Sequence, residues 1–296
     1  MVVQEVVQYA ENIESEADLY AELGFFPLEL LSRDLKKAAE DLTASQARFF
    51  VDFYYTWQEA RKSSANIVRS SAAEYAGEDQ PNQLVGWLTE NAGRVENQIK
   101  GALGIYAGAH EVGRWSQSIF GVGPIISAGL LAHIDITKAP TVGHIWSFAG
   151  LNPDMVWEKG MKRPYNAKLK TLCWKMADVF MKNRNKPGDM YGHFYDSRKA
   201  YETAKNEAGE YGERAAKELE KKNIKDKDLK ALLESGKIPP GQIHNSSLRY
   251  VAKLFLAHWH HVAYESHYGT PPPKPYIIDR GHAHIIAPIN WPMETK

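Results

Sequence analysis

The stretch Ile119-Phe120-Gly121-Val122-Gly123-Pro124-Ile125-Ile126-Ser127-Ala128-Gly129-Leu130-Leu131 decides the fold around it. Apolar residues at helical spacing lie on both sides of a Gly-Val-Gly sequence, which predicts two helices joined by a tight turn. Gly121 and Gly123 suit a reversal that needs a positive φ or leaves no space for a Cβ atom. Pro124 fits the first turn of the second helix, where its missing N–H is not needed.

The same turn has the pattern of a helix-hairpin-helix, which grips the nucleic-acid backbone without reading its sequence. Backbone N–H groups at a helix N-terminus favour a phosphate oxygen. We therefore take Gly121, Val122, Gly123 and Ile125 as candidate phosphate contacts. The alternative is an ordinary corner between two helices, whose glycines serve packing alone.

The composition of the 296-residue chain is that of a globular protein with no net charge. No apolar run approaches the ~20 residues of a membrane span, and the start lacks a basic, signal-like flank. We expect a cytoplasmic protein without a membrane segment. The single cysteine, Cys173, excludes an internal disulfide and a Cys-rich zinc site.

The charges are unevenly distributed along the chain. Residues 1–60 carry 12 acidic and 4 basic side chains, whereas residues 159–186 carry nine Lys or Arg and one acid, Asp178. A basic block soon after a phosphate-binding turn indicates a nucleic-acid partner, although a solvated helix face is the alternative. The candidate cationic contacts are Lys159, Lys162, Arg163, Lys168 and Lys170.

Helical spacing recurs along the chain with no alternation of strands and helices, so the predicted fold class is all-α. We expect an acidic N-terminal arm (1–27), a long antiparallel helical hairpin or coiled-coil arm (28–116), a helix-hairpin-helix-containing helical domain (117–268) with a charged helical insertion at about 200–240, and a Pro-rich extended tail (269–296). The arm's helices are predicted at 28–75 and 83–118. It is expected to mediate self-association, which a mass measurement in solution would test.

Further helices are predicted from apolar periodicity and from capping residues. They span residues 142–149, 167–185 and 191–234, and a last one runs from Ser246 or Ser247 to Tyr268. An aromatic cluster on the first arm helix is interpreted as packing against another helix, with base stacking as the alternative. Its members are Phe49, Phe50, Phe53, Tyr54, Tyr55 and Trp57.

From the hairpin onward, the order of features resembles the C-terminal half of the bridge-RNA-guided insertion-sequence recombinases, the DEDD transposase family. In that family a coiled-coil arm precedes a Gly-hydrophobic-Gly-Pro hairpin, an Ala-Gly-Leu-x-Pro turn, a basic segment and further helices. The corresponding residues here are Gly121-Val122-Gly123-Pro124, Ala149-Gly150-Leu151-Asn152-Pro153, Lys168-Leu169-Lys170-Thr171-Leu172-Cys173, Gly192-His193-Phe194-Tyr195 and Arg249-Tyr250-Val251-Ala252. The resemblance covers roughly residues 83–268.

Two differences from the family indicate that this chain lacks the family's recombinase chemistry. The family's RuvC-like half, whose four acids hold divalent metal, has no counterpart in residues 1–60, which lack strand patterning. The family's serine nucleophile, just before a glycine, corresponds to the position of Lys159 in Glu158-Lys159-Gly160. Because a lysine has no hydroxyl for a phosphoserine intermediate, the resemblance implies a protein without recombinase catalysis.

A metal site is a further candidate at the C-terminal end. His258, His261 and Glu265 share one helix face, and His282 or His284 would complete a zinc or iron site. Hydrogen-bonding histidines are the simpler interpretation. No other cofactor is expected, because the chain has no Walker or dinucleotide fingerprint.

Three functions remain open at this stage. The first is a transposase-like nucleic-acid-binding protein, with DNA favoured over RNA and without catalysis. The second is a subunit that completes a nuclease or recombinase with a separate catalytic partner. The third is a protein-interaction module, an inhibitor or scaffold of mobile-element or phage origin that uses the acidic arm and the Pro-rich tail.

Overall fold

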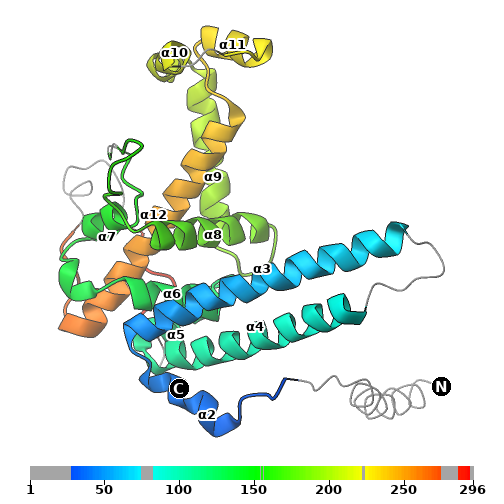
Figure 1. The fold of residues 1–296 in the computed structure, drawn as a ribbon. Helices are drawn as coiled ribbons and strands as arrows, with labels where there is room; N and C mark the ends of the chain where they lie inside the picture. The colour runs from blue at the N-terminus through cyan, green and yellow to red at the C-terminus, as the bar shows by residue number, and fades with distance from the viewer. Residues whose placement is uncertain are drawn as a thin grey trace. The chain divides into compact units, whose positions relative to one another are not determined.

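The computed structural model describes residues 28–74, 83–153, 155, 157–221, 224–274 and 286–293 (Figure 1). It is all helical, and none of these residues forms a strand, which confirms the predicted fold class. The chain divides into two compact units, Met1–Tyr106 and Ala107–Lys296. The acidic N-terminal arm, the predicted turn at 76–82 and residues 275–285 of the tail lie outside the described residues. No described helix is long and apolar enough to cross a membrane.

The first unit contains the helix α2 (Arg33–Lys37), the 3-10 helix η1 (Ala38–Asp41) and the long helices α3 (Ala44–Glu74) and α4 (Gln83–Ala109). The predicted continuous helix over residues 28–75 is therefore wrong. Thr43 and Gln46 form a capping box, in which Gln46 N donates to Thr43 Oγ1 (3.3 Å) and Thr43 N donates to Gln46 Oε1 (2.9 Å). This reciprocal pair satisfies N–H groups at a helix start, so a new helix begins at Ala44.

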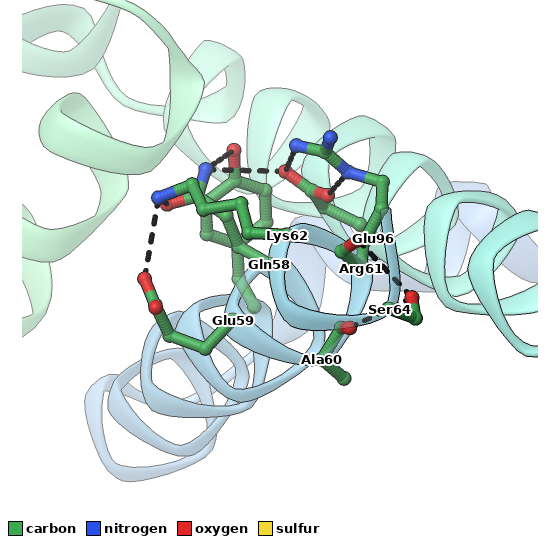
Figure 2. A network of polar contacts seen from close by, with 8 residues as sticks. Gln58, Glu59, Ala60, Arg61, Lys62, Ser64 and Glu96 are labelled. Atoms are coloured by element: carbon green, nitrogen blue, oxygen red, sulfur yellow. Dashed lines mark hydrogen bonds and ion pairs between the residues drawn. The ribbon is translucent and has the colours of Figure 1, made fainter. Parts of the chain in front are cut away.

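A polar network joins α3 to α4 (Figure 2). Arg61 Nε donates to the buried carboxylate of Glu96 at 2.5 Å, and Gln58 Nε2 donates to the same group at 3.1 Å. Burial acts to raise the pKa of Glu96, but the hydrogen bonds from Arg61, Gln58 and Tyr54 outweigh it and lower that pKa. The network therefore holds a charged Glu96 between the two helices at neutral pH.

The aromatic cluster of α3 is only partly used for packing within the described residues. Tyr54 is buried, whereas Phe49 and Phe53 are 60% and 37% exposed and stack on each other with centroids 5.5 Å apart. The prediction that the whole cluster packs against another helix is therefore wrong for Phe49, which is mostly exposed. Self-association through this arm stays a prediction.

After α4, whose last three residues already belong to it, the described residues of the second unit form nine helices. They are α5 (Glu111–Ser118), α6 (Pro124–His133), the 3-10 helix η2 (Ile136–Lys138), α7 (Val142–Phe148), α8 (Ala167–Asn183), α9 (Tyr191–Glu207), α10 (Gly212–Lys221), α11 (Lys227–Glu234) and α12 (Pro240–Tyr268). Helix α12 is the centre of this unit, because α5, α7, α8 and α9 all pack against it (Figure 1). Its side chains Phe255 and Trp259 are almost completely buried with Trp115, Phe180 and Tyr191.

Three helix boundaries differ from the prediction for physical reasons. The helix expected over 83–118 is broken at His110, because Gly113 approaches Ala107 so closely that a Cβ atom would lie 1.9 Å from its carbonyl oxygen. The helix expected over 191–234 is three helices, and Gly209 adopts a positive φ of 77° at the first break. Helix α12 starts at Pro240 instead of near Ser246, because proline is favoured in the first turn of a helix.

Candidate functional site

The turn between α5 and α6, residues 119–123, is named the glycine corner here. Gly121 has φ 88°, and a Cβ atom there would lie 3.1 Å from the side chain of Val179 in α8. Gly123 has an ordinary φ of −90°, and a Cβ atom would meet nothing within 4 Å. The prediction of a special conformation is thus confirmed for Gly121 and wrong for Gly123. Helix α6 begins at Pro124, as predicted.

The residues around the turn are closely packed. Val122 and Ile125 are only 5% and 7% exposed. Val122 N donates to Ile119 O at 3.0 Å, which closes the turn. No side chain caps the N-terminus of α6, where the first N–H groups of a helix have no intrahelical partner. These groups and the positive end of the helix dipole together attract an anion.

A groove of about 890 Å³ lies along the glycine corner. One wall is the corner itself, another is the start of α9 with Gly188, Met190 and Tyr191, and a third is Ile289 and Asn290. Phe120 and Met190 are large exposed apolar side chains of this groove. The groove combines apolar surface with backbone polar groups, which is typical of a binding cleft.

The C-terminal segment, residues 286–293, is held against the body of the second unit by hydrogen bonds. Trp115 Nε1 donates to Ile289 O (2.7 Å), Trp291 Nε1 donates to Glu265 Oε2 (2.7 Å), and Asn290 Nδ2 donates to Ser118 O (3.2 Å). The sequence predicted an extended tail and, in the third functional hypothesis, a role for it in binding a protein partner. The structure makes this part of it a wall of the groove.

Behind the groove lies a buried polar pair that supports its α9 wall. Tyr191 OH lies 2.6 Å from His258 Nδ1, and His258 Nε2 lies 2.9 Å from the carbonyl oxygen of Ile286. Since a carbonyl only accepts, Nε2 carries the proton and Nδ1 accepts from the tyrosine. Burial lowers the pKa of His258 to about 4. A neutral His258 therefore links α9, α12 and the C-terminal segment.

Asp189 is a buried acid in the turn that leads into α9. It is 2% exposed, and its two carboxylate oxygens have no hydrogen-bond partner among the described residues. Burial raises its pKa. Gly192 is required beside it, because a Cβ atom there would lie 1.9 Å from Asp189 Oδ2 and 2.5 Å from the backbone of Arg184. Burial thus disfavours the charged form of Asp189, and the backbone around Gly192 is tightly packed.

Residues 157–166, named the basic loop here, lead into α8. Lys159, Lys162 and Arg163 are exposed in this loop, Lys168 is exposed in the first turn of α8, and Lys170 is half-buried. Asn166 caps α8, since its Oδ1 accepts from Lys168 N and Leu169 N at 3.0 Å each. All five predicted cationic residues therefore lie at one end of α8.

The glycine corner and the basic loop lie at opposite ends of α8. Gly121 contacts Val179 near the C-terminal end of α8, whereas Asn166, at its start, hydrogen-bonds His133 at the last residue of α6 (3.2 Å). Helices α6 and α8 therefore run antiparallel. Lys168 and Val179 are eleven positions apart, which at 1.5 Å per residue corresponds to about 16 Å. The glycine corner and the five cationic residues are therefore separated along α8, and their role in nucleic-acid binding stays a prediction.

Other cations lie closer to the corner. Lys186 is exposed two residues before Gly188, which lines the groove, and Lys182 is exposed in the last turn of α8, where it pairs with Asp178 at 2.7 Å. Both belong to the basic block 159–186, but the predicted phosphate contacts are the residues nearer the Ala-Gly-Leu-x-Pro turn. The antiparallel packing of α6 on α8 was the missing information.

The structure places the candidate metal residues in other contacts. His258 uses both ring nitrogens as described above, and His261 Nε2 lies 3.3 Å from Glu265 Oε2. Glu265 also accepts from Trp291. No group of three His, Cys, Asp or Glu within the described part of the chain is arranged to hold a metal ion. His282 and His284 lie outside the described residues.

Cys173 is fully buried in the apolar face of α8, as its place in the sequence predicted. Burial raises the pKa of its thiol to about 12. The thiolate is the nucleophilic form of cysteine, so this residue is inert at neutral pH.

Comparison with curated proteins and with solved structures finds no match. A family model does match one part of the second unit. Residues 115–191, which contain the glycine corner, the basic loop and α8, are similar to the Transposase IS116/IS110/IS902 family, and this match supports a relation of that region to these transposases.

Proposed function

We propose that this transposase-like protein binds DNA through its second unit and has no recombinase chemistry of its own. The observation that carries the proposal is the family match over residues 115–191. The matched region contains an uncapped helix N-terminus beside an open groove and, at the other end of α8, a loop rich in exposed cations. Both features suit phosphate groups.

The distance between the glycine corner and the basic loop defines how the protein would contact a DNA duplex. Backbone N–H groups of the glycine corner take one phosphate, and Lys159, Lys162 and Arg163 of the basic loop neutralise others. The ends are about 16 Å apart along α8. A span of this size exceeds the distance between neighbouring phosphates, so the two ends contact different phosphates of the same duplex.

The lack of recombinase chemistry is proposed on the residues near the Ala-Gly-Leu-x-Pro turn. Glu158 and Lys159 are exposed there, and no serine occurs between Ser147 and Ser197. Neither a glutamate nor a lysine provides the hydroxyl that a phosphoserine intermediate requires.

Binding of a fluorescein-labelled 30-base-pair duplex across a salt series tests this function. Wild-type protein should bind with a strong salt dependence, because each phosphate contact contributes ~0.9 to the log–log slope. Reversing two loop charges (Lys162→Glu with Arg163→Glu) should weaken binding at least about tenfold and reduce the slope by ~2. The matched control reverses two exposed charges near α11 (Lys225→Glu with Lys227→Glu), which should leave binding within about twofold.

The corner is tested with Gly123→Asp in the same assay. The substitution is sterically open, and a carboxylate at the N-terminus of α6 favours the helix. It should therefore keep or raise the melting temperature while it repels phosphate and weakens binding. A wild-type affinity that does not respond to salt, or an affinity unchanged by all the variants, would contradict the proposed function.

A further inference from the structure

The basic loop has a feature that phosphate binding does not use. It exposes two large apolar side chains, Trp157 (38%) and Met161 (62%), among the exposed cations Lys159, Lys162 and Arg163. Exposed tryptophan is uncommon in a folded protein, and an aromatic group among cations is typical of nucleic-acid-binding surfaces.

The loop closes on itself in a way that holds the indole outside. Trp157 Nε1 donates to Met161 O at 2.8 Å, and Met161 N donates to Glu158 O at 3.1 Å. Gly160, between them, has φ 97°, which allows the reversal. The only polar atom of the indole is therefore satisfied within the loop, and the ring is oriented without being buried.

A cation lies over one face of the ring. The guanidinium carbon of Arg163 is 5.2 Å from the centre of the Trp157 ring. Indole and guanidinium are both groups on which nucleobases stack. The pair therefore places an aromatic ring and a planar cation together in the exposed loop.

The base of the loop is anchored to the body of the second unit. Gly150 has φ 64°, and a Cβ atom there would lie 2.8 Å from the Tyr165 ring, so that ring packs directly on the backbone after α7. Lys170 Nζ lies 4.3 Å from the centre of the same ring, and Asn166 N donates to Phe148 O at 2.8 Å. These contacts set the position from which Trp157 projects.

We propose that Trp157, flanked by Arg163, stacks on an unpaired base of a single-stranded nucleic acid while Lys159 and Lys162 contact the adjoining phosphates. This inference rests on the proposed function and names the strand form that the basic loop recognises. Bases inside a duplex are already stacked on both faces, so only an unpaired or extruded base is available to the indole. Every base has a π-face, so the contact discriminates strand form rather than sequence.

The test compares three fluorescein-labelled probes with the full chain: a 20-nucleotide oligothymidylate, the same strand with abasic sites in place of its bases, and a 20-base-pair duplex. Trp157→Ala should weaken oligothymidylate binding about 5- to 140-fold, the range expected for one stacked base. It should also abolish the preference of wild type for the intact strand over the abasic strand. Duplex binding should stay within about twofold.

Two further variants control for folding and for loss of an exposed tryptophan. Trp157→Phe retains a stacking ring and should keep most of the oligothymidylate affinity. Trp87→Ala removes an indole of equal exposure (39%) from α4 and should change no binding constant. Circular dichroism that matches wild type shows that each variant is folded.

The outcomes separate this inference from the proposed function. Salt-dependent duplex binding with equal oligothymidylate affinity for wild type and Trp157→Ala overturns the stacking site alone. No binding of any probe by wild type overturns both. Binding of a polyglutamate peptide or of anionic phospholipid vesicles that depends on Trp157, without binding of oligothymidylate, assigns the loop to a different partner and overturns the inference.

Discussion

The C-terminal end of α8 meets the closely packed glycine corner, whereas its N-terminal end follows a loop of exposed cationic side chains. The glycine corner is surrounded by buried groups, among them Val122, Tyr191 and the unpartnered acid Asp189. The basic loop is exposed and stays in place through a few contacts at its base, such as the packing of Tyr165 on Gly150. Both ends suit an anion, but different physical forces maintain them.

The two ends should therefore respond differently to amino-acid substitution. The corner depends on close packing and on a neutral buried network, so it should be sensitive to anything that destabilises the fold. The loop depends on charge, so it should tolerate substitution structurally while losing affinity. The following predictions use stability to distinguish the two ends.

The largest expected effect is a loss of stability on acidification. His258 has a folded-state pKa of about 4, below the 6.5 of a free histidine, so the unfolded chain binds more protons between these values. The contribution of His258 to the free energy of unfolding is fully present above pH 6.5. It is lost as the pH falls towards 4, and the loss is at most about 3 kcal/mol. Urea denaturation at several pH values measures this.

Substitution of His258 checks the assignment. His258→Phe should be less stable than wild type at pH 7 but should lose less free energy of unfolding on acidification. His260, which burial also shifts to a lower pKa, contributes in the same direction and remains in this variant. A stability that is flat between pH 6.5 and 4 would contradict the role of the buried pair.

An intermediate effect is expected at the two corner glycines. Gly121→Ala should lower the free energy of unfolding by roughly 2 kcal/mol, because alanine is strained at φ 88° and its Cβ would crowd Val179. Gly123→Ala should change it by less than about 0.5 kcal/mol, because the site is open and φ is ordinary. Thermal denaturation of the pair measures the difference. Equal effects would mean that the corner is not packed as described.

The smallest stability effect is expected at the loop end. Asn166→Ala removes the cap of α8 and should cost about 1 kcal/mol. The exposed Asn185, just beyond the other end of α8, provides a control in which replacement by alanine should be nearly neutral. Chemical denaturation measures both variants. A loss at Asn166 as large as that at Gly121 would remove the contrast between the two ends.

Local sequence signals predicted several elements correctly. Pro124 marked the start of α6, Gly150 followed α7 with a positive φ, and the apolar stripe through Leu169 and Phe180 located α8. The same kind of signal was missed at Thr43, whose capping box starts α3. The Gly113 contact was not predictable, because it depends on where α5 lies relative to the end of α4.

The residues of the candidate site were found from sequence, but their grouping was not. Proximity along the chain favoured one surface made of the corner and the loop. The 17-residue helix α8 separates the loop from the corner. Because α8 packs antiparallel to α6, its last turn lies beside the corner and its start lies beside the end of α6. Trp157 was not singled out, because an isolated tryptophan in an irregular segment gives no periodic signal. Its exposure is known only from the folded loop.

The sequence alone determined the all-α class, most helices of the second unit and the uneven distribution of charge. Periodicity, capping and turn preferences act over about four residues, so they can be predicted from each segment of the chain alone. The tertiary structure decided that the C-terminal segment lines the groove, that His258 is neutral and that the glycine corner and the basic loop lie at opposite ends of α8. These facts depend on which apolar faces pack together around α12, and residues far apart in the chain set that packing jointly.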